Sequence, residues 1–249
     1  MSGHNRWAKI KHKKLASDVR KSKGWSKILK EITVAARTGG GDPANNARLR
    51  GSIDRARSDN MPHDTIQRAI KKGMGELEGS TYEEMIYEAY GPGGTALVIE
   101  ILTDNKNRAV ADIRHMLDRH GGKMASPGSV TYQFKKRGMI MFEAGSVDED
   151  RLMEAALDLG ADDLQNEGET VTVYTEPASY ITVKEGLEQK GFKPAGGEVA
   201  LLPDATIPIA GTDAEALARL MSALEDHDDV QNVYVNADID EGILARTEN

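Results

Sequence analysis

Hydrophobic residues in the first third of the chain recur at the three- and four-residue spacing of amphipathic helices. Lys23–Arg37 carries one such stripe, and Trp25 belongs to it, which favours a core position for this side chain over a stacking one. A glycine run then stops the helix, and Asp42-Pro43 is typical of an N-cap and first turn. The second helix would end near Ser58, and a third would follow Pro62. These patterns predict a small three-helix bundle.

Beyond a glycine-rich hinge at Gly75–Ser80 the pattern changes to strands mixed with helices. The predicted strands are Glu84–Ala89, Thr95–Leu102, Val130–Phe134, Met139–Phe142, Asp163–Asn166, Thr170–Tyr174, Glu198–Leu202 and Val230–Val235. The predicted helices are one capped by Thr103-Asp104-Asn105, and Asp148–Leu159, Ser179–Gln189 and Asp213–Leu224. From Met139 to Leu202 the order is β-α-β-β-α-β, which is the ferredoxin-like pattern.

The unit Thr95–Phe134 contains only half of such a fold, and the last predicted helix and strand resemble its missing half. This indicates that one domain is interrupted by another. The sequence therefore predicts an α+β protein, with an N-terminal three-helix domain followed by two α/β ferredoxin-like domains, the third inserted in the second. The predicted domains are residues 1–78 (basic arm and helices), residues 79–136 with 205–249 (discontinuous middle domain) and residues 137–204 (inserted domain).

Charge is distributed unevenly along the 249 residues, although the formal net charge is only −8. Residues 1–75 carry 18 Lys and Arg against 6 Asp and Glu, whereas the rest of the chain carries 14 against 34. A polyanion responds to the local potential and not to the sum over the molecule. The basic first third therefore predicts a nucleic-acid partner despite the acidic total.

Composition excludes several other classes of protein. The chain has no cysteine, so disulfides, thiolate nucleophiles and Cys-ligated zinc are excluded. No apolar run approaches the ~20 residues of a membrane span, and the first fourteen residues lack the apolar segment of a secretory signal. The six histidines do not have metal-site spacing. We expect a soluble cytoplasmic protein with no membrane contact, metal, cofactor or small-molecule substrate.

The candidate nucleic-acid-binding residues fall into three groups: the N-terminal arm, the flanks of the second helix and the end of the third. They are Arg6, Trp7, Lys9, Lys11, Lys13 and Lys14; Arg48, Arg50, Arg55 and Arg57; and Lys71 and Lys72. Such cations suit phosphate contacts and give no sign of base readout. Trp7 can stack on an unpaired base or dock the arm on the protein. The competing interpretations are a solubilising tail, a solvated helix face, and compensation of the helix macrodipole by Lys71 and Lys72.

Three other segments have a structural interpretation that competes with a functional one. Gly91-Pro92-Gly93-Gly94 precedes a strand and lacks the Lys-Ser/Thr of a phosphate loop, which favours a turn. Thr103–Arg108 lies at a strand-to-helix junction, where capping explains most of the polar residues and a binding role is the alternative. The acidic cluster Glu225–Asp229 is interpreted as a solvated helix end, or as a lobe that repels nucleic acid or meets a basic protein.

The N-terminal run Gly3–Lys13 (GHNRWAKIKHK) resembles the opening signature of the YebC family. Further matching segments are Lys30–Arg37, Gly40–Pro43, Asn60–Pro62, Arg68–Gly73, Tyr90–Gly94 and Leu102–Arg108, so the resemblance covers nearly the whole chain. Members have been called PmpR-type transcriptional regulators, and a mitochondrial relative is a translational activator of cytochrome oxidase. The resemblance implies three domains, the third inserted in the second, nucleic-acid binding in bacterial cytoplasm and no known catalytic centre. Pro127 departs from the family's plainer Gly/Ser turn, which affects only a loop.

These observations predict a non-enzymatic, nucleic-acid-binding regulator of gene expression, and foremost a DNA-binding transcriptional regulator. The alternative is a ribosome- or RNA-associated translation factor that acts on elongation or on specific messages. An enzyme acting on RNA would need convergent carboxylates or a nucleophile–base pair, and the sequence shows no such spacing.

Overall fold

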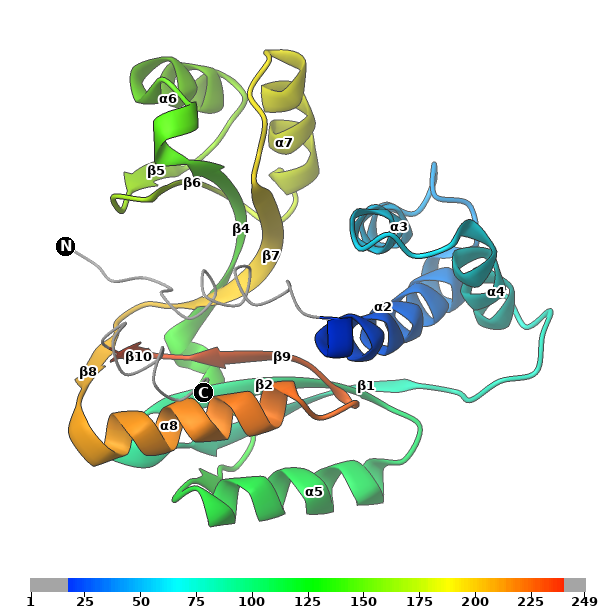
Figure 1. The fold of residues 1–249 in the computed structure, drawn as a ribbon, viewed down its shortest axis with the longest axis vertical. Coiled ribbons are helices and arrows are strands. Elements are labelled where there is room, and N and C mark those ends of the chain that lie inside the picture. The colour runs from blue at the N-terminus through cyan, green and yellow to red at the C-terminus, as the bar shows by residue number, and fades with distance from the viewer. Residues whose placement is uncertain (1–17, 240–249) are drawn as a thin grey trace. The chain divides into compact units, whose positions relative to one another are not determined.

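The computed structural model describes residues 18–239, with side chains from residue 24 onward. These residues form two compact units, coloured along the chain in Figure 1. The first unit runs to Thr131 and resumes at Thr206, and the second is Tyr132–Ala205. The chain therefore leaves the first unit and returns to it, as an inserted domain requires.

The N-terminal part of the first unit is helical and consists of α2 (Asp18–Gly39), α3 (Ala47–Ser58) and α4 (His63–Gly73). Their apolar stripes share one core, as the spacing predicted. Its buried members are Ile28, Ile32, Ala35, Ala36, Leu49, Ile53, Ala56, Met61, Ile66, Ala69 and Ile70. Trp25 packs against this core while its Nε1 donates to the carbonyl of Asp59 at 3.2 Å. The core interpretation of Trp25 is confirmed.

The start of the second helix differs from the prediction at Asp42. Asn46 caps α3, because its side-chain oxygen accepts from the amide of Leu49 at 3.0 Å. Its Nδ2 also donates to the carbonyl of Ala35 at 2.8 Å, so one buried side chain serves the end of α2 and the start of α3. Asp42 instead closes a turn by accepting from the amide of Ala44 at 3.0 Å.

The middle part of the first unit is a four-stranded antiparallel sheet in the order β3-β1-β2-β9. Its strands are β1 (Glu83–Tyr90), β2 (Ala96–Thr103), β3 (Lys123–Met124) and β9 (Val230–Val235), and its helices are α5 (Lys106–Arg119) and α8 (Gly211–Glu225). Leu97, Ile99 and Ile101 alternate along β2 and pack with both helices in one core. A short parallel pair, β8 (Ile207–Ile209) with β10 (Ala237–Ile239), was not predicted.

Glu88 explains why the predicted strand Val130–Phe134 is wrong. Its buried carboxylate, 7% exposed, accepts hydrogen bonds from the amides of Gly128, Val130 and Thr131 at 2.5, 2.6 and 2.9 Å. Amides held by a carboxylate cannot join a strand ladder, and the chain makes a 3₁₀ turn, η3 (Thr131–Gln133), instead. We call this arrangement the Glu88 clamp.

The second unit has the predicted β-α-β-β-α-β order. Its elements are β4 (Phe134–Glu143), α6 (Glu149–Asp158), β5 (Asp163–Asn166), β6 (Thr170–Thr175), α7 (Tyr180–Gln189) and β7 (Gly196–Pro203). The sheet order is β5-β6-β4-β7, with every neighbouring pair antiparallel. Phe142 lies in the core beneath both helices and meets Phe192 edge to face at 6.4 Å between centroids. The α+β, ferredoxin-like class is confirmed, and the domain boundaries in residue numbers remain predictions.

The Glu88 clamp should stabilise the first unit. Replacing Glu88 with Gln removes the charge that the three amides share, and we expect a loss of about 3 kcal/mol in the free energy of unfolding. Amide hydrogen exchange at Gly128, Val130 and Thr131 should accelerate together. The control is Glu78→Gln, an exposed carboxylate, which should leave these amides unchanged. Equal exchange in both variants would contradict the clamp.

The clamp also predicts a pH dependence. Burial by itself raises the pKa of Glu88, but the hydrogen bonds from Val130, Gly128 and Thr131 lower this pKa from 4.5 to about 2. A carboxyl whose folded-state pKa is lowered stabilises the protein above its ordinary pKa. The stability difference between the native protein and Glu88→Gln should therefore be constant near neutrality and shrink as the pH falls from about 4.5 toward 2. Urea unfolding of both proteins across this range measures it.

Replacing two glycines of the helical part should change its free energy of unfolding in opposite directions. A Cβ at Gly73 would meet the Thr33 carbonyl oxygen and lie 2.7 Å from the Ala36 Cβ, so Gly73→Ala should cost about 2 kcal/mol. Gly51 lies inside α3, and apart from the nearby backbone of its own helix no described atom comes within 4 Å of the position that a Cβ would take. Gly51→Ala should therefore gain about 0.5–1 kcal/mol. Urea unfolding followed by tryptophan fluorescence reports on this part, because both tryptophans of the chain belong to its N-terminal third. If both variants changed the free energy of unfolding in the same direction, the packing described for Gly73 and Gly51 would be contradicted.

Candidate nucleic-acid interface

The basic arm predicted to bind nucleic acid lies outside the described residues. Its candidate residues are Arg6, Trp7, Lys9, Lys11, Lys13 and Lys14. The remaining candidates belong to α3 and α4, and the structure places each of them.

Two of the four arginines of α3 are engaged by the protein itself. Arg48 forms ion pairs with Glu31, at 2.7 Å, and with Glu84. Partial burial would lower the pKa of its guanidinium, but the hydrogen bonds with Glu84 and Glu31 raise this pKa above the ordinary value. Arg50 is half-buried and donates to the carbonyl of Pro43 at 3.0 Å, which holds the loop between α2 and α3. Neither side chain offers its charge freely to a ligand.

The other two arginines of α3 are exposed. Arg57 pairs with Asp54 at 3.6 Å, and both side chains are largely in solvent, so the pair is weak. Arg55 has no ion-pair partner among the side chains that the structure describes. Both can therefore donate to phosphate at little cost.

Helix α4 adds three exposed cations on neighbouring positions. Lys71 and Lys72 lie in its last turn, and Arg68 stands one turn before them. Within the described part of the chain these three side chains form no ion pair. Arg68 was not among the predicted residues. Its spacing of three and four residues from Lys71 and Lys72 was the signal that could have identified it.

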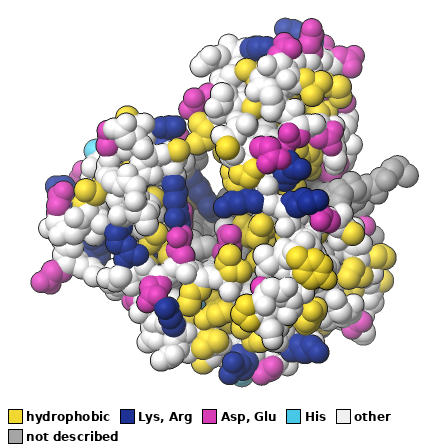
Figure 2. Space-filling model, turned by 180° about the vertical axis from the view of Figure 1, so that it is seen from behind, with side chains coloured by type: hydrophobic (Ala, Val, Ile, Leu, Met, Phe, Trp, Pro, Cys, Tyr) yellow, Lys and Arg dark blue, Asp and Glu magenta, His cyan; other side chains and the backbone are white. Residues whose placement is uncertain are grey.

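Apart from Arg48, which Glu31 and Glu84 hold, the exposed cations of α3 and α4 are Arg55, Arg57, Arg68, Lys71 and Lys72. Figure 2 shows Lys and Arg side chains standing on the lobe of these helices, at the left of that view, with Asp and Glu side chains between them. The helical surface is therefore mixed in charge, and its cations are individually accessible.

A different set of helical cations contacts the acidic cluster Glu225–Asp229. Lys30 Nζ lies 2.7 Å from Asp229 Oδ1 and 3.0 Å from the carbonyl of Asp228, and Lys27 Nζ lies 2.5 Å from the carbonyl of Glu225. Asp229 is only 3% exposed, so interpreting the whole cluster as a solvated helix end was wrong for this residue. Nothing in the sequence indicates that Lys27 and Lys30 meet this cluster, because about 200 residues separate them along the chain.

Asp229 is compensated by two cations and a hydroxyl. Besides Lys30, Arg108 Nη2 lies 2.9 Å from its Oδ2, and Thr103 Oγ1 donates to the same oxygen at 2.9 Å. Burial alone would raise the pKa of Asp229, but the hydrogen bonds from Lys30, Arg108 and Thr103 lower it to about 2. The carboxylate is therefore ionised throughout the physiological range.

The segment Thr103–Arg108 is accounted for by these contacts. Asn105 caps α5 by accepting from the amide of Arg108 at 3.1 Å, as the capping interpretation predicted. Arg108 also pairs with Asp104 at 3.0 Å. The polar residues of this motif fix the start of α5 and hold Asp229.

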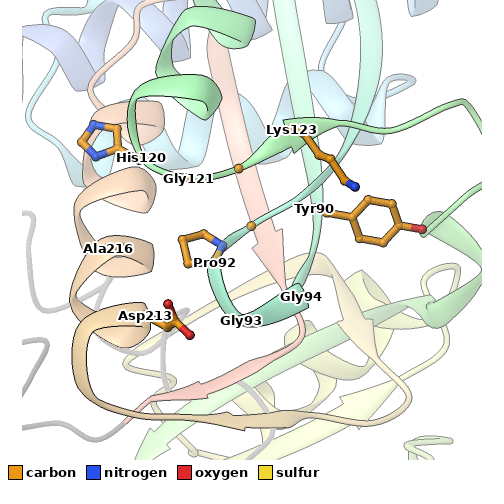
Figure 3. A pocket seen from close by; sticks show the side chains of 11 residues that line it. Tyr90, Pro92, Gly93, Gly94, His120, Gly121, Lys123, Asp213 and Ala216 are labelled. Carbon is orange, nitrogen blue, oxygen red and sulfur yellow. The ribbon is translucent and has the colours of Figure 1, made fainter.

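A hollow of about 680 Å³ lies beside the glycine turn of the first unit (Figure 3). It is lined by Tyr90, Gly91, Pro92, Gly93, Gly94, His120, Gly121, Gly122, Lys123, Asp213 and Ala216. The amide of Gly91 donates to Thr95 at 2.8 Å and that of Gly94 to Gly91 at 3.2 Å, so the turn uses these amides internally. Lys123 Nζ lies over the Tyr90 ring, 5.8 Å from its centroid. The arrangement matches the predicted turn and not a phosphate loop.

Neither a metal-binding cluster nor a membrane-spanning helix is found in the described part of the chain. Among them, no three His, Asp or Glu side chains come together as a metal site would require. Over the same part of the chain, no helix is both long and apolar enough to cross a bilayer.

Comparison with known proteins points to the same family as the sequence motifs. The family model described as "TACO1/YebC protein N-terminal domain" matches residues 5–76, and "TACO1/YebC second and third domain" matches residues 82–237. A relative in Acidithiobacillus ferrooxidans is 53% identical over 100% of this chain and 99% of its own length. Another, in Trichlorobacter lovleyi, is 51% identical over 96% of each chain. Both are described as "Probable transcriptional regulatory protein".

A solved structure has the same fold. The conserved hypothetical protein from Aquifex aeolicus superposes with a TM-score of 0.85 at 43% identity, covering 94% of this chain and 97% of its own. The resemblance found in the sequence is thus confirmed over nearly the full length. The chain belongs to the TACO1/YebC family.

Proposed function

We propose that this protein is a nucleic-acid-binding regulator of gene expression that works in the cytoplasm and contacts phosphates through its basic N-terminal third. The observation that carries the proposal is that five exposed cations of α3 and α4 form only one weak ion pair among the described side chains. They are Arg55, Arg57, Arg68, Lys71 and Lys72. The regulatory names of relatives at about half identity support the same role. We propose duplex DNA as the target and transcription as the regulated process.

Binding would follow from counterion release. Each phosphate that a Lys or Arg neutralises on duplex DNA releases condensed cations, so log affinity falls with log salt by about 0.9 per contact. The basic arm adds Arg6, Lys9, Lys11, Lys13 and Lys14 to the cations of α3 and α4. Beyond Gly75 the chain is acidic, with 34 Asp and Glu against 14 Lys and Arg, and would repel the polyanion. The two ends of the chain together would orient nucleic acid toward the N-terminal third.

Charge-removal variants test where the contact lies. Replacing Lys9, Lys11, Lys13 and Lys14 with Ala, or Arg55, Arg68, Lys71 and Lys72 with Ala, should weaken binding. The salt slope should flatten by about 0.9 for each phosphate that the variant no longer neutralises. Fluorescence anisotropy of a labelled duplex over a series of salt concentrations measures both quantities.

The matched control removes two lysines from the second unit. Lys184 pairs with Glu188 and Lys190 with Asp158, so Lys184→Ala with Lys190→Ala removes cations that are already compensated. The slope should stay as in the native protein. A slope unchanged by both N-terminal variants, or reduced equally by the control, would exclude the proposed surface.

A competition experiment separates DNA from RNA as the target. The protein should retain a labelled duplex DNA in the presence of excess single-stranded RNA and ribosomes, and should stay near the top of a low-salt sucrose gradient of cell lysate. Sedimentation with ribosomes and loss of DNA to the RNA competitor would instead establish the translation alternative. Binding of neither polymer would sink the proposal.

A further inference from the structure

The helical part of the first unit is attached to its α/β part by polar contacts. The core of α2–α4 and the core beneath the β3-β1-β2-β9 sheet are separate clusters with no residue in common. Each part therefore has an apolar core of its own. The hydrogen bonds and ion pairs that the structure shows between them are made by charged side chains.

In these contacts the helical part supplies the cations and the α/β part supplies the oxygens. Lys30 meets Asp229 at 2.7 Å and its ammonium also lies 5.6 Å from the centroid of the Tyr82 ring. Arg37 donates to the carbonyl of Tyr82, and Arg48 pairs with Glu84. Lys27 donates to the carbonyl of Glu225 at 2.5 Å. We call this set of contacts the charge latch.

The four cations of the charge latch are the donors that a phosphate backbone would also bind. Lys27, Lys30, Arg37 and Arg48 each contact an oxygen of the α/β part, as they would contact a phosphate oxygen. A cation cannot satisfy a carboxylate and a phosphate fully at once. Docking of the helical part and binding of a polyanion by these residues therefore compete.

The carboxylate of Asp229 would remain compensated if Lys30 moved away. A buried carboxylate left without a cation would be strongly unfavourable, and that cost would keep the latch shut. Arg108 and Thr103 hold its other oxygen at 2.9 Å each and belong to the α/β part itself. The charge stays compensated when Lys30 leaves, so the latch can open without unfolding the α/β part.

We propose that the charge latch is an autoinhibitory contact that nucleic acid opens, with Lys27, Lys30, Arg37 and Arg48 passing from the acidic α/β part to the phosphates. The inference rests on the proposed function. In the closed state the latch masks part of the cationic surface, so affinity is reduced by the fraction of molecules that are closed. Salt opens it as well, because the exposed pair Arg48–Glu84 is screened.

Distance measurements test the opening directly. The chain has no cysteine, so Ser58→Cys on α3 and Ala111→Cys on α5 give two unique, exposed labelling sites. Electron–electron double resonance between spin labels should give one narrow distance distribution at low salt. The distribution should become longer and broader at high salt, with saturating duplex DNA and with inorganic polyphosphate.

Variants separate the latch from the binding surface. Asp229→Asn removes one of the two carboxylate charges that hold the latch and leaves all N-terminal cations in place. It should open the molecule without ligand and lower the Kd for duplex DNA by about three- to tenfold. Glu84→Gln, at an exposed position, should act in the same direction and guards against a folding defect from the buried change. The matched control is Asp104→Asn, which removes a partner of Arg108 but contacts no helical cation in the structure. It should change neither distance nor Kd.

The outcomes distinguish this inference from the proposed function. Duplex binding with an unchanged distance distribution overturns the latch and leaves the proposed function standing. Failure to bind any nucleic acid overturns the proposed function, and the salt and polyphosphate measurements then still decide the latch. The charge latch is refuted if the spin-label distances are unchanged by salt, by polyphosphate, by Asp229→Asn and by Glu84→Gln.

Discussion

The buried carboxylate of Asp229 joins several elements of the first unit. An ionised side chain that is 3% exposed must be compensated inside the protein, and its donors come from three different elements. Lys30 is on α2, Arg108 is on α5, and Thr103 ends β2. This one charge therefore ties the start of α5, the end of β2 and the helical part to the turn before β9. The fold gives an acidic residue a structural task that an acidic composition alone would not suggest.

The two α/β parts share a sheet order but differ in how the chain enters it. In the second unit, β4 is the first strand of an ordinary ferredoxin-like order. In the first unit, β1 precedes β2 and takes the position that the third strand has in that order, and the insertion follows the η3 turn. The Glu88 clamp fixes the backbone of Gly128–Thr131 just before the chain leaves the unit. The clamp therefore anchors the host unit at the point where the inserted domain begins.

The division of the N-terminal cations into two sets connects this architecture with function. Arg55, Arg68 and Lys71 are exposed and available for phosphate, whereas Lys30 and Arg48 are held by carboxylates. Phosphate binding by the first set raises the local concentration of polyanion near the second. A protein with separate apolar cores and a polar junction can respond to such a competitor by moving one part as a body. Under the proposed mechanism the acidic α/β part would both repel nucleic acid and compete with it for these cations.

The sequence by itself determined the elements whose pattern is local. Helical spacing from Trp25 onward, the buried strand around Ile99 and the β-α-β-β-α-β order all follow from neighbours along the chain, and the structure contains them. The sequence also identified the uneven charge. Only the tertiary structure decided that the Val130 amide donates to Glu88, so that this segment forms a turn, and that Asp229 pairs with Lys30. The first contact joins residues 42 positions apart and the second joins residues 199 positions apart. The hydrophobic periodicity of a sequence does not indicate which distant group will pair with a buried carboxylate.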